Sequence, residues 1–150
     1  MQHRYELTLT WTGNRGQGTE SYANYSRDHV ISAAGKPDLL GSADATYRGD
    51  ARRWNPEELL LASLSSCHQL WFLHLCSDAG VVVTSYRDQP IGEMKTDATG
   101  SGQFTSVTLR PTVETRDSLP AQKLEALHDA AHDKCFIARS VNFPVGVETV

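Results

Sequence analysis

The sequence contains three cysteines, Cys67, Cys76 and Cys135, and these residues carry its strongest potential for chemistry. A cysteine can be a small buried hydrophobic residue, a metal ligand or, as a thiolate, a nucleophile. Cys67 follows Ser63 and the pair Ser65-Ser66, so its surroundings are polar enough to admit a substrate. The residues alone leave open whether Cys67 is functional or structural.

Cys76 is better explained as a buried hydrophobic residue, because its neighbours are Leu73, Leu75 and Val81. Nine residues of helix from Cys67 to Cys76 amount to about 900° of rotation and roughly 13 Å of rise. The two side chains therefore point to opposite faces. A disulfide needs Cα atoms within about 7 Å, so we expect no disulfide between them.

A metal site is an alternative for the third cysteine. His128, His132 and Cys135 follow one another at i, i+4 and i+7 of a predicted helix and could present three ligands on one side, with Cys67 as a fourth. The simpler interpretation makes His128 and His132 polar residues of the helix surface. A non-catalytic ligand-binding protein is a further alternative, with a pocket walled by aromatic residues that could equally be plain core: Trp54, Trp71, Phe72 and Phe143.

A long helix must position Cys67. Asn55 is a capping residue, Pro56 suits the first helical position, and Glu57 and Glu58 oppose the helix dipole. The apolar pattern continues to about Gly80, which predicts about 25 residues or roughly 37 Å of helix. Apolar residues fall on nearly every side, while interspersed Ser, His and Gln argue against a membrane span. We therefore expect a central helix buried from several directions, partly by a second subunit, and hence a homodimer.

The remaining pattern predicts strands on both sides of this helix. Residues 5–11 alternate as a half-buried strand, residues 21–32 supply one or two more, and 33–53 form a long irregular connection. After the helix, extended stretches at 81–94 and 103–113 suggest a hairpin, 120–134 a second helix with Leu124 and Leu127 inward, and 145–150 a short strand. The predicted order β-β-β-α-β-β-α-β is of the α+β class.

Composition limits the function classes. A chain of 150 residues that is 39% hydrophobic can bury one core, so we expect one domain over residues 1–150. Its 14 basic and 18 acidic residues, with no basic run, make nucleic acid an improbable partner. No signal-peptide pattern begins the chain and no membrane association is expected, so we predict a cytoplasmic protein.

Three segments together resemble the Ohr/OsmC family of organic hydroperoxide resistance and osmotically inducible proteins. Asn55-Pro56-Glu57-Glu58-Leu59-Leu60 followed by Cys67 is similar to its N-P-E-x-L-(x)7-C motif. Trp11-Thr12-Gly13 with Arg15-Gly16-Gln17-Gly18-Thr19 resembles W-x-G followed by R-G-x-G-T, and Ala131–Cys135 resembles the second cysteine helix. The resemblance implies an intertwined α+β homodimer, with two active sites at the subunit interface and the central helix carrying Cys67.

The resemblance also implies an activity and roles for four residues. The family reduces organic hydroperoxides, and hydrogen peroxide less well, through a cysteine that becomes a sulfenic acid. Cys67 would be that cysteine, and Cys135 would close a disulfide with it. Arg15 would favour the thiolate and contact the peroxide, and Glu57 would orient Arg15. Arg27 is a rival for the role of Arg15.

No bound cofactor is expected, because an external dithiol, lipoyl or thioredoxin-like, would reduce the disulfide. The chain departs from the family in having Phe136, where a proline commonly follows the second cysteine, so Cys135 could be positioned differently. Glu57 precedes Cys67 by ten residues, about 15 Å along a continuous helix. Either Arg15 bridges part of this gap, or the partner subunit supplies Glu57, or the helix breaks early.

Overall fold

The computed structural model describes residues 1–149, which form two compact units, residues 1–59 and residues from 60 onward. The single domain expected over 1–150 stays a prediction. In chain order the elements are β1 (Thr8–Trp11), β2 (His29–Ser32), β3 (Leu39–Gly41), η1 (Ala45–Tyr47), α1 (Pro56–Asp78), β4 (Val83–Asp88), β5 (Ile91–Thr96), β6 (Gly102–Leu109), β7 (Pro111–Thr115), α2 (Ala121–Lys134), η2 (Ala138–Ser140) and β8 (Val145–Val147).

The first unit contains an antiparallel sheet of order β1-β2-β3. The strand predicted over 5–11 is confirmed from Thr8 onward, and 21–32 supplies one strand rather than two. The connection 33–53 is less irregular than expected, because Leu39 to Gly41 pair with β2 and the short 3₁₀ helix η1 follows. Three residues are too few to reveal a strand by alternation.

Helix α1 begins and ends where the sequence indicates. The Asn55 side chain accepts from the Glu58 amide at 2.8 Å, and the Glu58 carboxylate accepts from the Asn55 amide at 3.2 Å, which is a reciprocal capping box. At the other end Gly80 has φ +69°, and the Val81 amide donates to the Cys76 carbonyl at 2.8 Å. Glycine adopts this left-handed conformation without the steric cost of a Cβ atom, so the helix stops there.

The predicted hairpin of the second unit is confirmed, but each of its two long stretches is divided into two strands. β5 pairs with β6, β4 pairs with β7, and β8 joins β6 in parallel. The break between β4 and β5 falls at Gln89-Pro90, where proline cannot donate to the ladder. Residues 1–149 therefore contain eight strands instead of the six predicted, within the α+β class expected. The last strand ends at Val147, and Val150 of the predicted strand lies outside the described residues.

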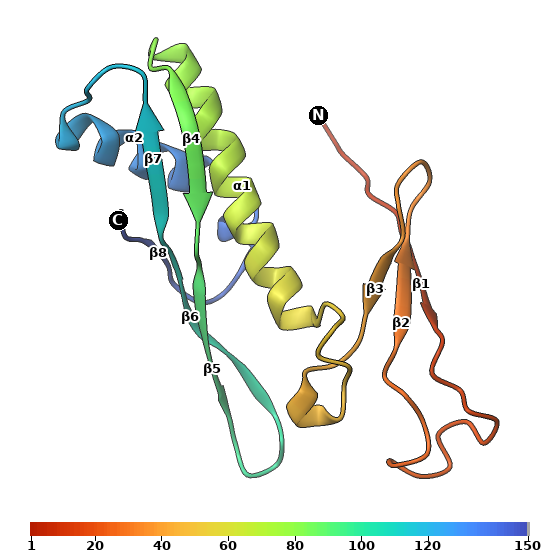
Figure 1. Cartoon of the computed structure of the whole chain (residues 1–150). Coiled ribbons are helices and arrows are strands. Elements are labelled where there is room, and N and C mark those ends of the chain that lie inside the picture. The colour runs from red at the N-terminus through yellow and green to blue at the C-terminus, as the bar shows by residue number, and fades with distance from the viewer. Residues whose placement is uncertain (150) are drawn as a thin grey trace. The chain divides into compact units, whose positions relative to one another are not determined.

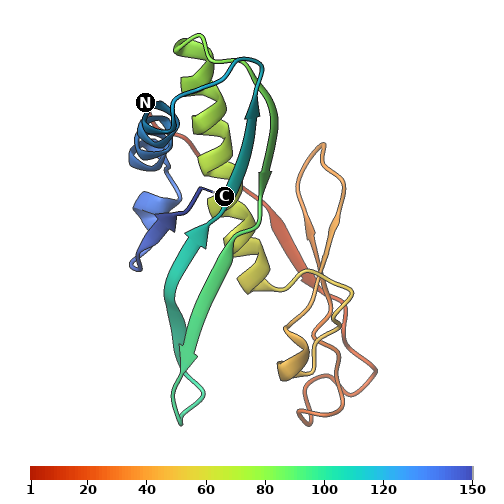
Figure 2. The same cartoon turned by 60° about the vertical axis from the view of Figure 1, so that its left-hand side comes forward.

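Helix α1 runs along β4 and β7 (Figures 1 and 2). Its buried residues recur every four positions, and they are Leu64, His68, Phe72 and Cys76. Phe72 and Cys76 pack with Ala131 of α2 and with residues of β4 and β7, whereas Leu64 packs with Val107 and Leu109 of β6. Leu124 and Leu127 are half-buried against the Phe72 cluster, as expected of the inner face of α2.

We expected α1 to be buried from several directions. In this single chain only one stripe of the helix is fully buried, and Leu70 is 65% exposed. By length and composition alone, α1 could also cross a membrane. Its buried stripe nevertheless contacts strands and a second helix, as the core helix of a globular unit does.

Candidate active site

Cys67 and Cys135 lie together in the second unit although they are far apart in sequence. We call these two residues the thiol pair. Cys67 is half-buried on α1, and Cys135, which caps the C-terminus of α2, is 1% exposed. Burial raises the pKa of the Cys135 thiol to about 11, and a side-chain hydrogen bond with Cys67 contributes to the rise. Both cysteines are free thiols. One accessible and one buried thiol in contact is an arrangement suited to forming a disulfide.

Backbone groups hold Cys135 in place. The Ala138 amide donates to the Cys135 sulfur at 3.4 Å, the Cys135 amide donates to the His132 carbonyl, and its carbonyl accepts from the Arg139 amide. The C-terminus of α2 and the start of η2 thus fix the position of this residue. Phe136, in place of the usual proline, does not prevent the contact with Cys67.

Cys76 has the environment predicted for it. The residue is 1% exposed among the side chains of the Phe72 cluster, and burial raises the pKa of its thiol. A thiol that resists ionisation is a poor nucleophile. Cys76 is therefore a small core residue.

A second contact joins α1 and α2 beside the thiol pair. His68 Nε2 and His128 Nδ1 are 3.0 Å apart, and the two residues are 0% and 2% exposed. Their rings are nearly parallel, with centroids 5.3 Å apart, and Phe72 stacks on His128 at 4.1 Å. His68 Nδ1 and His128 Nε2 have no hydrogen-bond partner among the described residues. We call His68 and His128 the histidine pair.

Burial keeps the histidine pair uncharged at neutral pH. It lowers the pKa of His68 to about 4, with a further contribution from the charge that His128 would carry, and it lowers the pKa of His128 to about 4 as well. Burial removes the water that would stabilise an imidazolium, and Asp88 is the group whose charge favours the protonated form of His68. Asp88 is itself engaged by the Ser65 hydroxyl at 2.5 Å and the Arg110 amide at 2.7 Å.

We predict a loss of stability in mild acid that comes from the histidine pair. The unfolded chain takes up protons on these residues as the pH falls below about 6.5, whereas the folded pair does so only near pH 4. The contribution of the two neutral histidines to the free energy of unfolding is therefore complete above pH 6.5. It falls by about 3 kcal/mol per histidine as the pH is lowered towards 4. Urea unfolding at pH 7.5, 6, 5 and 4 measures it. The exposed His74→Ala variant should retain the loss, and an unchanged unfolding free energy between pH 7.5 and 5 would contradict the prediction.

The interpretation of His128 as a surface residue was wrong. The face of α2 that carries His128, Ala131 and Cys135 is the face that packs into the core, so His128 is buried and His132 is half-buried. Among residues 1–149, no three His, Cys, Asp or Glu side chains gather closely enough to hold a metal ion. His128 contacts His68 instead, which gives no support to the ligand set of His128, His132 and Cys135.

His68 was missed as a site residue by the sequence reasoning. A signal for it exists, since Leu64, Phe72 and Cys76 share its four-residue spacing and together mark one buried stripe. A histidine on such a stripe needs a partner for its ring nitrogens. The partner, His128, could not be identified without knowing which face of α2 meets α1.

The aromatic residues considered as pocket walls have different environments. Phe72 is completely buried, Phe143 packs against the Leu64 cluster, and Trp54 is 53% exposed. Trp71 and Phe136 form an edge-to-face pair with centroids 5.7 Å apart. Phe72 and Phe143 are therefore core residues, whereas Trp71 lies one helical turn after Cys67 and Phe136 directly follows Cys135.

In the first unit, a turn presents Arg15. The Asn14 side chain accepts from the amides of Gly16 and Gly18 at 2.9 and 3.0 Å, and both glycines have positive φ. The Arg15 side chain is exposed, and no hydrogen bond or ion pair to it is found within residues 1–149. This turn leaves the guanidinium free to meet a ligand.

Arg27 is engaged within the first unit. Its guanidinium donates to the carbonyls of Tyr22 and Tyr25, both at 2.6 Å, and lies 4.2 and 4.1 Å from the centroids of their rings. Moving Arg27 to a substrate would break four contacts. Arg15 is consequently the better candidate for a catalytic cation.

Glu57 is half-buried near the start of α1, and the capping box employs Glu58 rather than Glu57. The helix is continuous from Pro56 to Asp78, so an early break is excluded. Of the three ways to connect Glu57 with Cys67, bridging by Arg15 and supply from a partner subunit remain.

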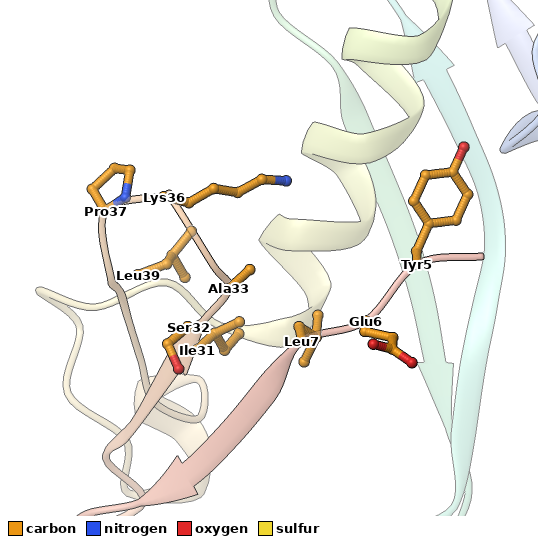
Figure 3. Close-up of a pocket in the computed structure, with 9 residues that line it drawn as sticks. All are labelled: Tyr5, Glu6, Leu7, Ile31, Ser32, Ala33, Lys36, Pro37 and Leu39. Carbon is orange, nitrogen blue, oxygen red and sulfur yellow. The ribbon is translucent and has the colours of Figure 1, made fainter. Parts of the chain in front are cut away.

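A pocket of about 370 Å³ lies within the first unit (Figure 3). Its wall comes from the segment before β1, the end of β2 and the turn leading to β3, and its residues are Tyr5, Glu6, Leu7, Ile31, Ser32, Ala33, Lys36, Pro37 and Leu39. The lining contains neither a cysteine nor a histidine. This pocket therefore contains no thiol that could attack a peroxide.

Comparison with known proteins identifies the family. The family model described as OsmC-like protein matches residues 49–150, which include both members of the thiol pair. This chain belongs to the OsmC-like protein family. An OsmC-like protein of unknown function from Vibrio cholerae is 33% identical, with a TM-score of 0.89 over 99% of this chain and 100% of that one. No match was found among curated proteins.

Solved structures of lower identity include proteins named for organic hydroperoxide resistance. The one from Elizabethkingia anophelis is 16% identical, with a TM-score of 0.70 over 99% of this chain and 96% of that chain. OhrB of Bacillus subtilis is 20% identical, with a TM-score of 0.67 over 97% of this chain and 98% of that chain. At these identities the likeness establishes the OsmC-like fold, in agreement with the resemblance noted in the sequence.

Proposed function

We propose that this OsmC-like protein is a thiol-dependent peroxidase that reduces organic hydroperoxides, and hydrogen peroxide less well. The observation that carries the proposal is the contact between Cys67, which is accessible, and Cys135, which is buried. Membership of a family that includes organic hydroperoxide resistance proteins supports it. The fold alone would not, because one fold can serve several functions.

In the proposed reaction, the Cys67 thiolate attacks the distal oxygen of the hydroperoxide. The S–O bond forms, the O–O bond breaks, and the alkoxide takes up a proton to leave as an alcohol. Cys135 then attacks the sulfur of the Cys67 sulfenic acid. The S–S bond forms, the S–O bond breaks, and the proton of Cys135 leaves with the oxygen as water.

Arg15 and Glu57 are proposed to assist the first step. A guanidinium near the thiolate would stabilise its charge and would donate to the peroxide oxygens as the leaving group becomes negative. The free side chain of Arg15 and the engagement of Arg27 support Arg15 in this role. Glu57, which the capping box leaves free, would orient Arg15 through a bidentate ion pair.

The proposal includes partners outside this chain. An external dithiol, lipoyl or thioredoxin-like, would reduce the disulfide, and no bound cofactor would be required. A homodimer would cover the apolar residues that α1 leaves exposed, such as Leu70. A cytoplasmic location would fit, since the free thiols need a reducing compartment.

Stoichiometric oxidation tests the proposal. We expect the reduced protein to consume one equivalent of cumene hydroperoxide within seconds and hydrogen peroxide more slowly. The intact mass should fall by about 2 Da, because one disulfide replaces two thiols. Dithiothreitol should then restore the original mass and permit further turnover. A protein that leaves both peroxides unconsumed would exclude the peroxidase function.

A further inference from the structure

We propose that the hydrogen bond of the histidine pair positions Cys135 against Cys67 for disulfide formation. His68 and His128 would be positioning residues, acting through the placement of α2 on α1 and not on the peroxide. The inference rests on the proposed function for its biological meaning. Its test does not require peroxide.

The histidine pair and the thiol pair join the same two segments. His68 directly follows Cys67 on α1, and His128 precedes Cys135 by seven residues, about 10 Å along α2. Since a helix of this length moves as a rigid element, the distance between His68 and His128 constrains where the end of α2 lies on α1. Disulfide geometry is strict, with S–S near 2.05 Å and Cβ atoms about 3.8 Å apart. A small sliding of α2 would therefore separate the sulfur atoms.

Two buried imidazoles are less favourable than apolar side chains if the contact between α1 and α2 requires only packing. Each leaves one ring nitrogen without a partner among the described residues, which destabilises the folded state. Leucine or phenylalanine would fill the same space without that penalty. The histidines make the contact between α1 and α2 directional, because the 3.0 Å hydrogen bond forms only when His68 Nε2 and His128 Nδ1 face each other. The stacked Phe72 ring holds His128 in that orientation.

The surroundings are consistent with an uncharged pair at neutral pH. The titratable groups that influence His68 are Asp88 of β4 and His132 and His128 of α2. Tyr86 of β4 contacts Phe72 at a centroid distance of 5.7 Å, and its hydroxyl also lacks a partner among the described residues. Asp88 already accepts two hydrogen bonds. Among these groups, the hydrogen bond between the two imidazoles is thus the one that joins α1 directly to α2.

Four polar variants distinguish the effect of the directional hydrogen bond from the effect of side-chain packing between α1 and α2. Glutamine resembles histidine at Nε2 and asparagine at Nδ1, so His68→Gln and His128→Asn keep a polar atom where the hydrogen bond needs one. His68→Asn and His128→Gln are equally polar but place the amide elsewhere. The measurement is the equilibrium between the reduced protein and oxidised dithiothreitol, quenched by alkylation and quantified by intact mass. Circular dichroism verifies the fold of each variant.

We expect the equilibrium constant for disulfide formation in His68→Gln and His128→Asn to remain within about twofold of the wild-type value. In His68→Asn and His128→Gln the constant should fall about tenfold, which is the effect of one lost buried hydrogen bond. Equal equilibria in all four variants, shifted or not, would overturn the inference. The peroxidase proposal is judged separately, by consumption of cumene hydroperoxide. A wild type that forms the disulfide with dithiothreitol but ignores peroxide would remove that proposal and leave the role of the histidine pair standing.

Discussion

The Cys67→Ser variant is expected to consume organic hydroperoxide at least about 10³-fold more slowly than the wild type, because a serine hydroxyl does not ionise at neutral pH and is a weak nucleophile. The variant should retain its fold, because Cys67 is only half-buried and serine is only slightly smaller than cysteine. The decay of cumene hydroperoxide in excess dithiothreitol measures the rate. A Cys67→Ser variant as active as the wild type would remove Cys67 from the mechanism.

The other two cysteines supply matched controls for this experiment. Cys135→Ser should still react once, adding about 16 Da as a sulfenic acid on Cys67 instead of losing about 2 Da. Cys76→Ala should retain peroxide consumption, because Cys76 is buried in the Phe72 cluster and burial raises the pKa of its thiol. If Cys135→Ser lost even the first turnover, Cys135 would be needed for peroxide attack and not only for disulfide formation.

The Phe72→Ala variant is expected to lose about 3 to 5 kcal/mol of unfolding free energy. Phe72 is fully buried, stacks on His128 at 4.1 Å and contacts Tyr86, so its removal opens a cavity at the meeting of α1, α2 and β4. Urea unfolding followed by circular dichroism at pH 7.5 measures the loss.

Leu70→Ala on the same helix is the control, because Leu70 is 65% exposed and its truncation should change stability by about 0.5 kcal/mol or less in the monomer. A loss below about 1 kcal/mol for Phe72→Ala would mean that the surrounding side chains close the cavity. A large loss for Leu70→Ala would instead indicate that an association buries Leu70, as the proposed homodimer would.

Much of the fold was predictable because its signals are local. The ends of α1 follow from Asn55 with Glu58 and from Gly80, which act within a few residues of themselves. Helix α2 begins after Pro120, as its pattern indicated. The strands were harder to predict, since the division of the hairpin at Gln89-Pro90 and the pairing of β3 with β2 depend on partners distant in sequence.

For the candidate site, residue types and their spacing were enough to indicate which side chains are chemically able to act. It identified Cys67 at the centre of a long helix, Cys135 at the end of a second helix, and Cys76 as a core residue. The family resemblance added Arg15 and Glu57. The packing of distant segments was needed to show that the thiol pair is in contact, that Arg27 is engaged by Tyr22 and Tyr25, and that His128 is buried against His68. The physical reason is that helical periodicity defines the faces of each helix separately, whereas the packing of α1 on α2 selects which faces meet.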